Sequence, residues 1–154
     1  MSNGTTLESI MRPASIIDED ASIREALERM NKEKTNELLV VDADGMLSGE
    51  VSVSDLLGIV IPDDVDGDNA LLHLADEEAF REAIKEAADK SVSECMSYAV
   101  ESIRADARLI DVAATAIAMG QARIPVVDHE NRPVGIISRQ GLRHILSIYL
   151  DVKE

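Results

Sequence analysis

Apolar and polar positions alternate along this chain in one pattern that occurs twice. In the first occurrence, short apolar runs with the length of strands flank a stretch with the 3.6-residue spacing of an amphipathic helix. Ser22-Ile-Arg-Glu25 reads as a capping box at the start of that helix. Turn residues Asp42–Gly45 separate the last two runs. The predicted order is β-α-β-β-α, with segments at 16–17, 22–30, 38–41, 47–51 and 54–57.

The second occurrence follows the same order. It predicts a lead strand over 100–103, a helix from Leu109 that ends at Gly120, and two strands around a turn at 129–132. A final helix is expected to turn three apolar side chains inward, those of Leu142, Ile145 and Leu146. The two predicted strands are 124–128 and 134–137.

The two patterns also share identical residues at a constant offset. Val40-Val41-Asp42, followed by Gly49 and Ser52, returns 86 residues later as Val126-Val127-Asp128, followed by Gly135 and Ser138. Repetition at this length indicates one supersecondary unit used twice, with any ligand site expected where the copies meet. We therefore expect an α/β fold of two pseudo-symmetric β-α-β-β-α halves packed as one module. The expected repeats are 7–61 and 91–150, joined by an acidic connector, 62–90, with an amphipathic helix beginning near Asp76.

Composition narrows the class of protein. The chain has 154 residues, 45% apolar, and a net charge of −15. Such a charge argues against binding nucleic acid or an anionic membrane through a general basic surface, since both are polyanions. No apolar run approaches the roughly 20 residues that span a bilayer. The single cysteine, Cys95, excludes an intrachain disulfide, which favours a cytoplasmic protein.

Three repeated motifs together resemble a known family. They are the hydrophobic-Met starts Ile10-Met11 and Cys95-Met96, the strand Ile124-Pro-Val-Val-Asp128, and Gly49-x-Val-Ser-x-x-Asp55. In this order they are similar to the cystathionine-β-synthase (CBS) domain family in its paired form. The resemblance implies a regulatory module that binds an adenosyl ligand, such as AMP, ADP, ATP or S-adenosylmethionine, and forms a homodimer. The chain shows no catalytic domain, so the regulated partner would be a separate, unidentified protein.

Ser52-x-x-Asp55 lies where a strand is predicted to become a helix, and two interpretations fit it. Ser at an N-cap with an acid three residues later is a common helix start. The same geometry lets Asp55 accept hydrogen bonds from ribose hydroxyls, while the serine hydroxyl and helix N–H groups face a phosphate. The family resemblance favours the second interpretation and adds Ser54 to the candidate site.

The second repeat departs from this pattern. Ser138-Arg139-Gln-Gly141 has glycine where the first repeat has Asp55, so we expect one good nucleotide site rather than two, with Arg139 left to attract a phosphate. Arg123, two residues before Pro125, is either a phosphate contact or a solvated strand end. Together with Arg143 and His144, these arginines concentrate positive charge in the second repeat.

An adenine ring would lie against apolar strand residues. The alternative is that these residues serve only in the hydrophobic core. They are Ile16, Ile17, Leu38 and Leu39, with Pro125 at the position that matches Leu39.

Other reactive residue types give weak signals. Cys95 matches Ile10 of the other repeat and is interpreted as a small buried hydrophobe. His73, His129 and His144 lack partner spacing, and the Asp64-x-Asp66-x-Asp68 run lacks the glycine and glutamate of a calcium loop. We therefore predict no catalytic residue, metal or resident cofactor.

The leading hypothesis is a regulatory, ligand-sensing module whose adenosyl ligand lies in the cleft between the repeats. The alternative is a structural or protein-interaction module whose pockets bind no nucleotide. An enzyme is the least supported interpretation, because the sequence shows no pairing of a nucleophile with a base.

Overall fold

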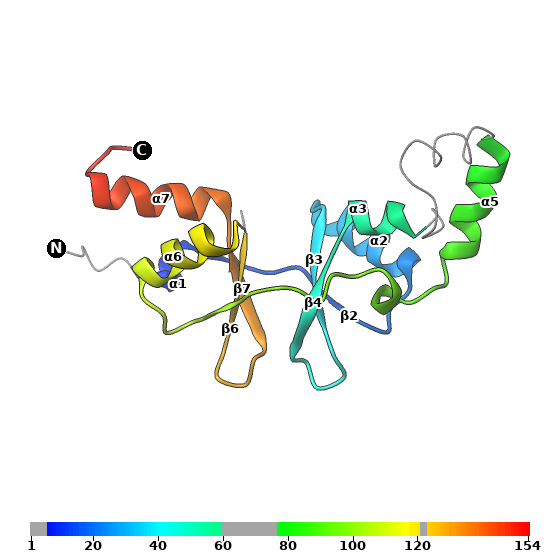
Figure 1. The fold of residues 1–154 in the computed structure, drawn as a ribbon, viewed down its shortest axis with the longest axis horizontal. Coiled ribbons are helices and arrows are strands. Elements are labelled where there is room, and N and C mark those ends of the chain that lie inside the picture. The colour runs from blue at the N-terminus through cyan, green and yellow to red at the C-terminus, as the bar shows by residue number, and fades with distance from the viewer. Residues whose placement is uncertain (1–5, 60–76, 121–122) are drawn as a thin grey trace. The chain divides into compact units, whose positions relative to one another are not determined.

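The computed structural model describes residues 6–59, 77–120 and 123–154, which fall into two compact units. Unit 1 comprises residues 1–14, 45–47 and 100–154, and unit 2 comprises 15–44 and 48–99. Each unit has a β-sheet with helices on one of its faces (Figure 1). The predicted α/β class with two β-α-β-β-α repeats is confirmed.

Unit 2 contains a sheet of three strands in the order β2-β3-β4. Helices α2 and α3 lie on the same face of it (Figure 1). Helix α5 follows residues 60–76, which include the Asp64–Asp68 run and lie outside the described residues. The elements are β2 (Ile16–Asp18), α2 (Ile23–Glu33), β3 (Glu37–Val41), β4 (Leu47–Ser52), α3 (Val53–Gly58), α5 (Glu77–Ala87) and a 3-10 turn (Val92–Glu94).

Unit 1 contains a sheet of four strands in the order β1-β7-β6-β5. Its two long helices, α6 and α7, contact each other and cover one face of the sheet (Figure 1). The elements are α1 (Leu7–Ile10), β1 (Met11–Arg12), β5 (Ile103–Arg104), α6 (Leu109–Met119), β6 (Ile124–Val127), β7 (Pro133–Ile137) and α7 (Arg139–Leu150).

The strand registers of the two units are the same at the repeat offset. In unit 2, β2 pairs parallel to β3 with Ile17 opposite Val40. In unit 1, β5 pairs parallel to β6 with Ile103 opposite Val126, and both residues lie 86 positions after their counterparts in unit 2. The repeated sequence therefore encodes a repeated register as well as a repeated order of elements.

Each unit also contains the opening segment of the other repeat. Residues 7–14 lie in unit 1, where β1 pairs antiparallel with β7, and Arg12 is opposite Ile136. Residues 92–99 lie in unit 2, where Ser97 forms the matching bridge with Glu50. A repeat of the sequence and a compact unit of the fold are thus different sets of residues.

The repeated glycines, Gly49 and Gly135, lie where these opening segments cross the sheets. A Cβ atom on Gly49 would be 2.2 Å from the Ser97 carbonyl oxygen, and one on Gly135 would be 2.7 Å from the Arg12 carbonyl oxygen. Both distances are too short for a side chain. The glycine shared by the two repeats is therefore a requirement of close backbone approach.

Two details of the sequence prediction are wrong. The strand expected over 100–103 is confined to Ile103–Arg104, because only these two residues pair with β6. The repeat offset agrees with this position, since it aligns β2 with residues 102–104. Leu146, expected to face inward, is 61% exposed, whereas Ile145 is buried at 2%. A helical step of about 100° per residue carries Leu146 beyond the buried face.

Each unit has its own apolar core. In unit 2 the core lies between the sheet and α2 and includes Leu38, Val40, Val51 and Ala26. In unit 1 it includes Val112, Ile124, Ile137 and Ile145. Among residues 6–59, 77–120 and 123–154, every helix is too short or too polar to cross a bilayer.

Candidate functional site

Ser52 and Asp55 form a capping box at the junction of β4 and α3. The Asp55 backbone N–H donates to Ser52 Oγ at 3.2 Å, and the Ser52 backbone N–H donates to Asp55 Oδ2 at 2.8 Å. Ser52 Oγ also donates to Oδ2, at 3.1 Å. These bonds hold the half-buried carboxylate in one orientation, because all three join Asp55 to Ser52 and two of them end on Oδ2.

The opposite carboxylate oxygen, Oδ1, receives no hydrogen bond from a described residue in this arrangement. It is therefore available to accept hydrogen bonds from a ligand. Fewer hydrogen-bond donors are available to a phosphate than the sequence suggested. The Ser52 hydroxyl already donates to Asp55 Oδ2, and the Val53 N–H donates to the Asn36 carbonyl at 3.0 Å. Ser54 is exposed in the first turn of α3.

Cys95 lies beside Asp55 in unit 2. Partial burial and the nearby charges of Asp55 and Glu94 raise the pKa of its thiol to about 11. The thiol is therefore protonated at neutral pH, as expected of a small hydrophobe rather than a nucleophile. The match of Cys95 to Ile10 of the first repeat also predicted a small hydrophobic residue at this position.

The apolar candidates of unit 2 divide between the two faces of the sheet. Ile17 and Leu38 belong to the core that the helices cover. Ile16 is opposite Leu39 in the register, and strand alternation places both on the other face. A concavity of about 550 Å³ beside β2 and α2 includes Ile16 and Ile17 but not Asp55.

The matching position in unit 1, Gly141, has a structural reason to be glycine. It is buried in the first turn of α7, and a Cβ there would lie 3.3 Å from the Ile10 carbonyl oxygen and 3.2 Å from Ile137 Cγ2. Its N–H donates to Ser138 Oγ at 3.3 Å. Unit 1 thus keeps the serine half of the capping box and has no carboxylate.

The remaining candidates of unit 1 occupy different environments. Pro125 is fully buried in β6. Arg123 and Arg139 are exposed, at the entrance to β6 and in the first turn of α7. The structure therefore places seven candidates in unit 2, around Asp55 and on β2 and β3, and four in unit 1.

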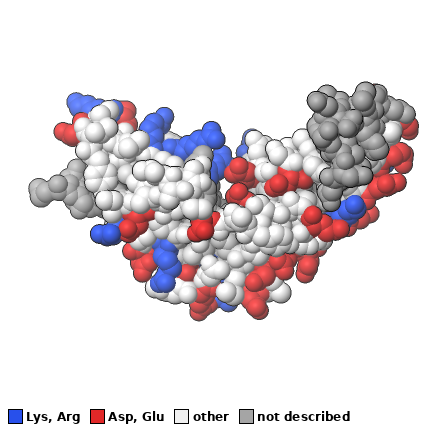
Figure 2. Space-filling model, viewed as in Figure 1, with Lys and Arg blue, Asp and Glu red and all other residues white. Residues whose placement is uncertain are grey.

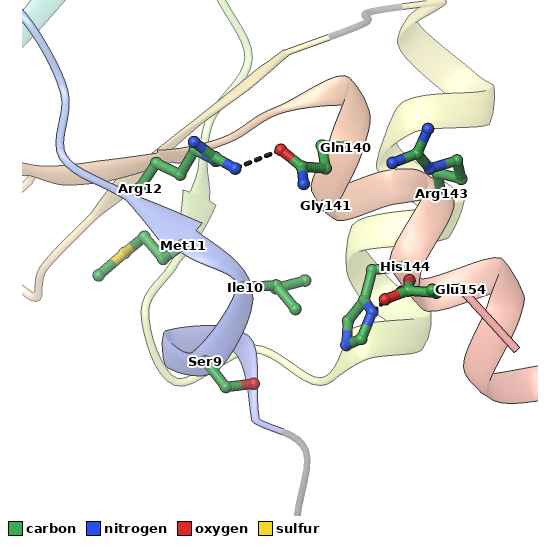
Figure 3. Close-up of a pocket in the computed structure, with 9 residues that line it drawn as sticks. All are labelled: Ser9, Ile10, Met11, Arg12, Gln140, Gly141, Arg143, His144 and Glu154. Atoms are coloured by element: carbon green, nitrogen blue, oxygen red, sulfur yellow. Dashed lines mark hydrogen bonds and ion pairs between the residues drawn. The ribbon is translucent and has the colours of Figure 1, made fainter.

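A cavity of about 330 Å³ in unit 1 was not found from the sequence (Figure 3). It forms because the opening segment of the first repeat packs against the start of α7 (Figure 3). The basic residues on α7 were visible in the sequence, but no local signal shows that residues 9–12 reach them. The lining residues are Ser9, Ile10, Met11, Arg12, Gln140, Gly141, Arg143, His144 and Glu154.

The sequence profile of the CBS domain matches residues 7–62 and 92–148, which is most of the chain. The chain belongs to the CBS-domain family. The matched ranges contain both capping serines, Ser52 and Ser138. The resemblance to paired CBS domains that the sequence motifs indicated is confirmed. Paired CBS domains are generally regulatory modules.

Several CBS proteins are similar to this chain. The uncharacterized protein MJ1426 of Methanocaldococcus jannaschii is 27% identical over 88% of each chain. The CBS-pair protein CBSX2 of Arabidopsis thaliana is 26% identical over 96% of this chain and 99% of its own, with a TM-score of 0.69. CBSX2 in complex with AMP is 27% identical over 95% and 99%, with a TM-score of 0.63.

A further CBS domain pair, that of protein MJ0100, has been solved in complex with 5′-methylthioadenosine and S-adenosyl-L-methionine. It is 23% identical over 94% of this chain and 98% of its own, with a TM-score of 0.62, and it supports the fold alone. Within the described part of this CBS pair, no three His, Cys, Asp or Glu side chains group in a way that could hold a metal ion.

Proposed function

We propose that this CBS pair is a regulatory module that binds an adenosyl ligand and signals its presence to a separate protein. Asp55 would accept hydrogen bonds from the ribose hydroxyls through Oδ1, with Ser52 and Ser54 beside it. The observation that carries the proposal is the fixed Asp55 carboxylate, whose capping box leaves one oxygen for a ligand. CBSX2, which has been solved with AMP, supports the choice of ligand class.

The proposed action is binding without catalysis. A ligand that binds one conformation of the module more tightly than another shifts the population toward it, and a partner protein can respond to that shift. AMP, ADP, ATP and S-adenosylmethionine all carry the adenosine that Asp55 would hold. We place this action in the cytoplasm, because the only cysteine cannot form an intrachain disulfide.

Thermal unfolding with each of these four ligands tests the proposal. A ligand at 100 times its Kd stabilises the folded protein by about 2.7 kcal/mol. We expect at least one ligand to raise the unfolding temperature of the wild type and to lose that effect in Asp55→Ala. Asp111→Ala is the matched control, since Asp111 also closes a capping box, with the Arg108 backbone N–H at 3.0 Å.

Both substitutions remove a helix cap and lower stability, but only Asp55→Ala should abolish the ligand effect. An equal ligand effect in the two variants would contradict the assignment of Asp55. No effect from any of the four ligands would favour the alternative, a CBS pair that serves only in protein interaction.

We also propose that the chain forms a homodimer through α6 and α7. Several apolar side chains on these helices are exposed, with Ile117 at 84%, Leu146 at 61% and Leu150 at 70%. The two helices contain one acidic residue, Asp111, which is paired with Arg108 at 3.1 Å. A second copy carrying a charge of −15 would meet little repulsion there.

A further inference from the structure

The cavity in unit 1 reverses the charge balance of the chain. The whole sequence has 30 acidic and 15 basic residues, excluding histidine. The cavity is lined by Arg12, Arg143 and His144 and by one acidic residue, Glu154. Lys and Arg side chains also gather above the start of α7 on the face shown in Figure 2. Positive charge inside a concave surface attracts anions more strongly than isolated surface charges do.

The basic groups of this cavity are only partly neutralised. Arg12 contacts the neutral side-chain oxygen of Gln140. The Arg143 side chain is exposed, and no ion pair joins it to another described residue. His144 Nδ1 contacts Glu154 Oε1 at 2.5 Å (Figure 3). The Glu154 carboxylate therefore shows that an oxyanion fits beside His144 in this cavity.

The matching positions of unit 2 have no basic side chain. At the repeat offset, Arg143 and His144 correspond to Leu57 and Gly58, and Gln140 corresponds to Ser54. Arg12, in the opening segment, corresponds to Ser97. Unit 2 has the carboxylate that suits a sugar diol, and unit 1 has the cations that suit an anion. The two units therefore differ in opposite chemical directions.

Glycine at position 141 keeps this space open. A Cβ atom there would point at the Ile10 carbonyl oxygen, 3.3 Å away, and both residues line the cavity. A longer side chain would lie between α7 and the segment that contributes Arg12. Glycine at the position where the first repeat has the Asp55 carboxylate thus leaves room beside the basic residues.

We propose that the cavity lined by Arg12, Arg143 and His144 is a separate binding site for a phosphate-class anion, which competes with the carboxylate of Glu154. The guanidinium groups donate paired hydrogen bonds to phosphate oxygens. The phosphate can belong to free polyphosphate or to the phosphate end of a nucleotide. The site uses no residue of unit 2, so it does not depend on the proposed function of Asp55.

Calorimetric titration of the full chain with inorganic pyrophosphate tests this site. We expect Arg143→Gln to weaken pyrophosphate binding about tenfold, the loss of one charge-assisted contact. Glu154→Gln should strengthen it roughly threefold, since an exposed competing ion pair is removed. Arg104→Gln is the control, because Arg104 is an exposed arginine of the same unit outside the cavity. Equal binding by the Arg143 and Arg104 variants would overturn the proposal.

Two further titrations separate this site from that of Asp55. Asp55→Ala should bind pyrophosphate as the wild type does, and adenosine, which has no phosphate, should not displace pyrophosphate. Displacement by adenosine would overturn the proposal, because it would place both at one site. Displacement by ATP would identify nucleotide phosphate as a source, and ATP without effect would identify free polyphosphate.

Discussion

At the scale of single residues, Asp55 combines a structural and a proposed binding role. One carboxylate oxygen closes the cap of α3, and the other is open to a ligand. The sequence could predict the cap, since Ser and Asp at this spacing are sufficient for it. It could not predict that the Ser52 hydroxyl would turn toward Asp55, because hydroxyl orientation depends on the local hydrogen-bond geometry.

Cys95 provides a chemical test of the environment around Asp55. With a pKa of about 11, its thiol should alkylate slowly at pH 7.5, and the rate should rise steadily as the pH approaches 11. Asp55→Asn should lower the pKa of Cys95, because the negative charge that disfavours the thiolate is gone. Iodoacetamide labelling followed by mass spectrometry measures both effects.

The urea-unfolded chain is the control for this labelling, since its cysteine has the ordinary pKa near 8.5. Rapid labelling of the folded protein at pH 7.5, equal to that of the unfolded chain, would contradict the described environment. The sequence indicated a buried hydrophobe at this position only through its match to Ile10, and it gave no sign of the adjacent carboxylate.

At the scale of elements, Gly49 and Gly58 differ in what surrounds them. A Cβ on Gly49 would collide with the Ser97 backbone at 2.2 Å, whereas a Cβ on Gly58 meets no described atom within 4 Å. We expect Gly49→Ala to destabilise the protein by about 3 kcal/mol, at the upper end of overpacking effects. Gly58→Ala should be neutral or stabilise by up to about 1 kcal/mol, since alanine favours the helix.

Urea denaturation followed by circular dichroism measures both changes. A loss in Gly49→Ala no larger than that in Gly58→Ala would contradict the close crossing of residues 96–97 over β4. The crossing explains why the glycine occurs at both 49 and 135, a repetition that the sequence displayed without its cause.

The order of elements was largely predictable because hydrophobic periodicity and the repeat offset agree. They disagree at 100–103, where apolar Val100 suggested an early strand, while the offset from β2 points to 102–104. The structure follows the offset, with β5 at Ile103–Arg104. The placement of residues 7–14 in unit 1 was not predictable, because strand pairing between distant segments leaves no periodic signal in either one.

At the scale of the whole molecule, the exposed apolar side chains of α6 and α7 lead to a prediction about assembly. Leu146→Glu should shift the chain from dimer to monomer, because it places two like charges in a surface that pairs with itself. Leu57→Glu, on α3 and 53% exposed, is the control and should leave the dimer intact. Sedimentation equilibrium of the wild type and both variants measures the association.

A monomeric wild type would contradict this assembly, as would dissociation by Leu57→Glu with none by Leu146→Glu. The sequence pattern placed Leu146 inside the fold, and the correction of that prediction supplies part of the evidence for the proposed surface. Exposure at the edge of a helical face depends on how the helix packs, which periodicity alone does not specify.

The division of roles between the two units is the central claim, with a sugar-binding carboxylate at Asp55 and none at Gly141. A crystal structure with the adenosyl ligand that gives the largest thermal shift tests it most directly. The account predicts ribose hydroxyls within hydrogen-bonding distance of Asp55 Oδ1, about 2.7 Å. Ribose bound beside Gly141, with none at Asp55, would contradict it.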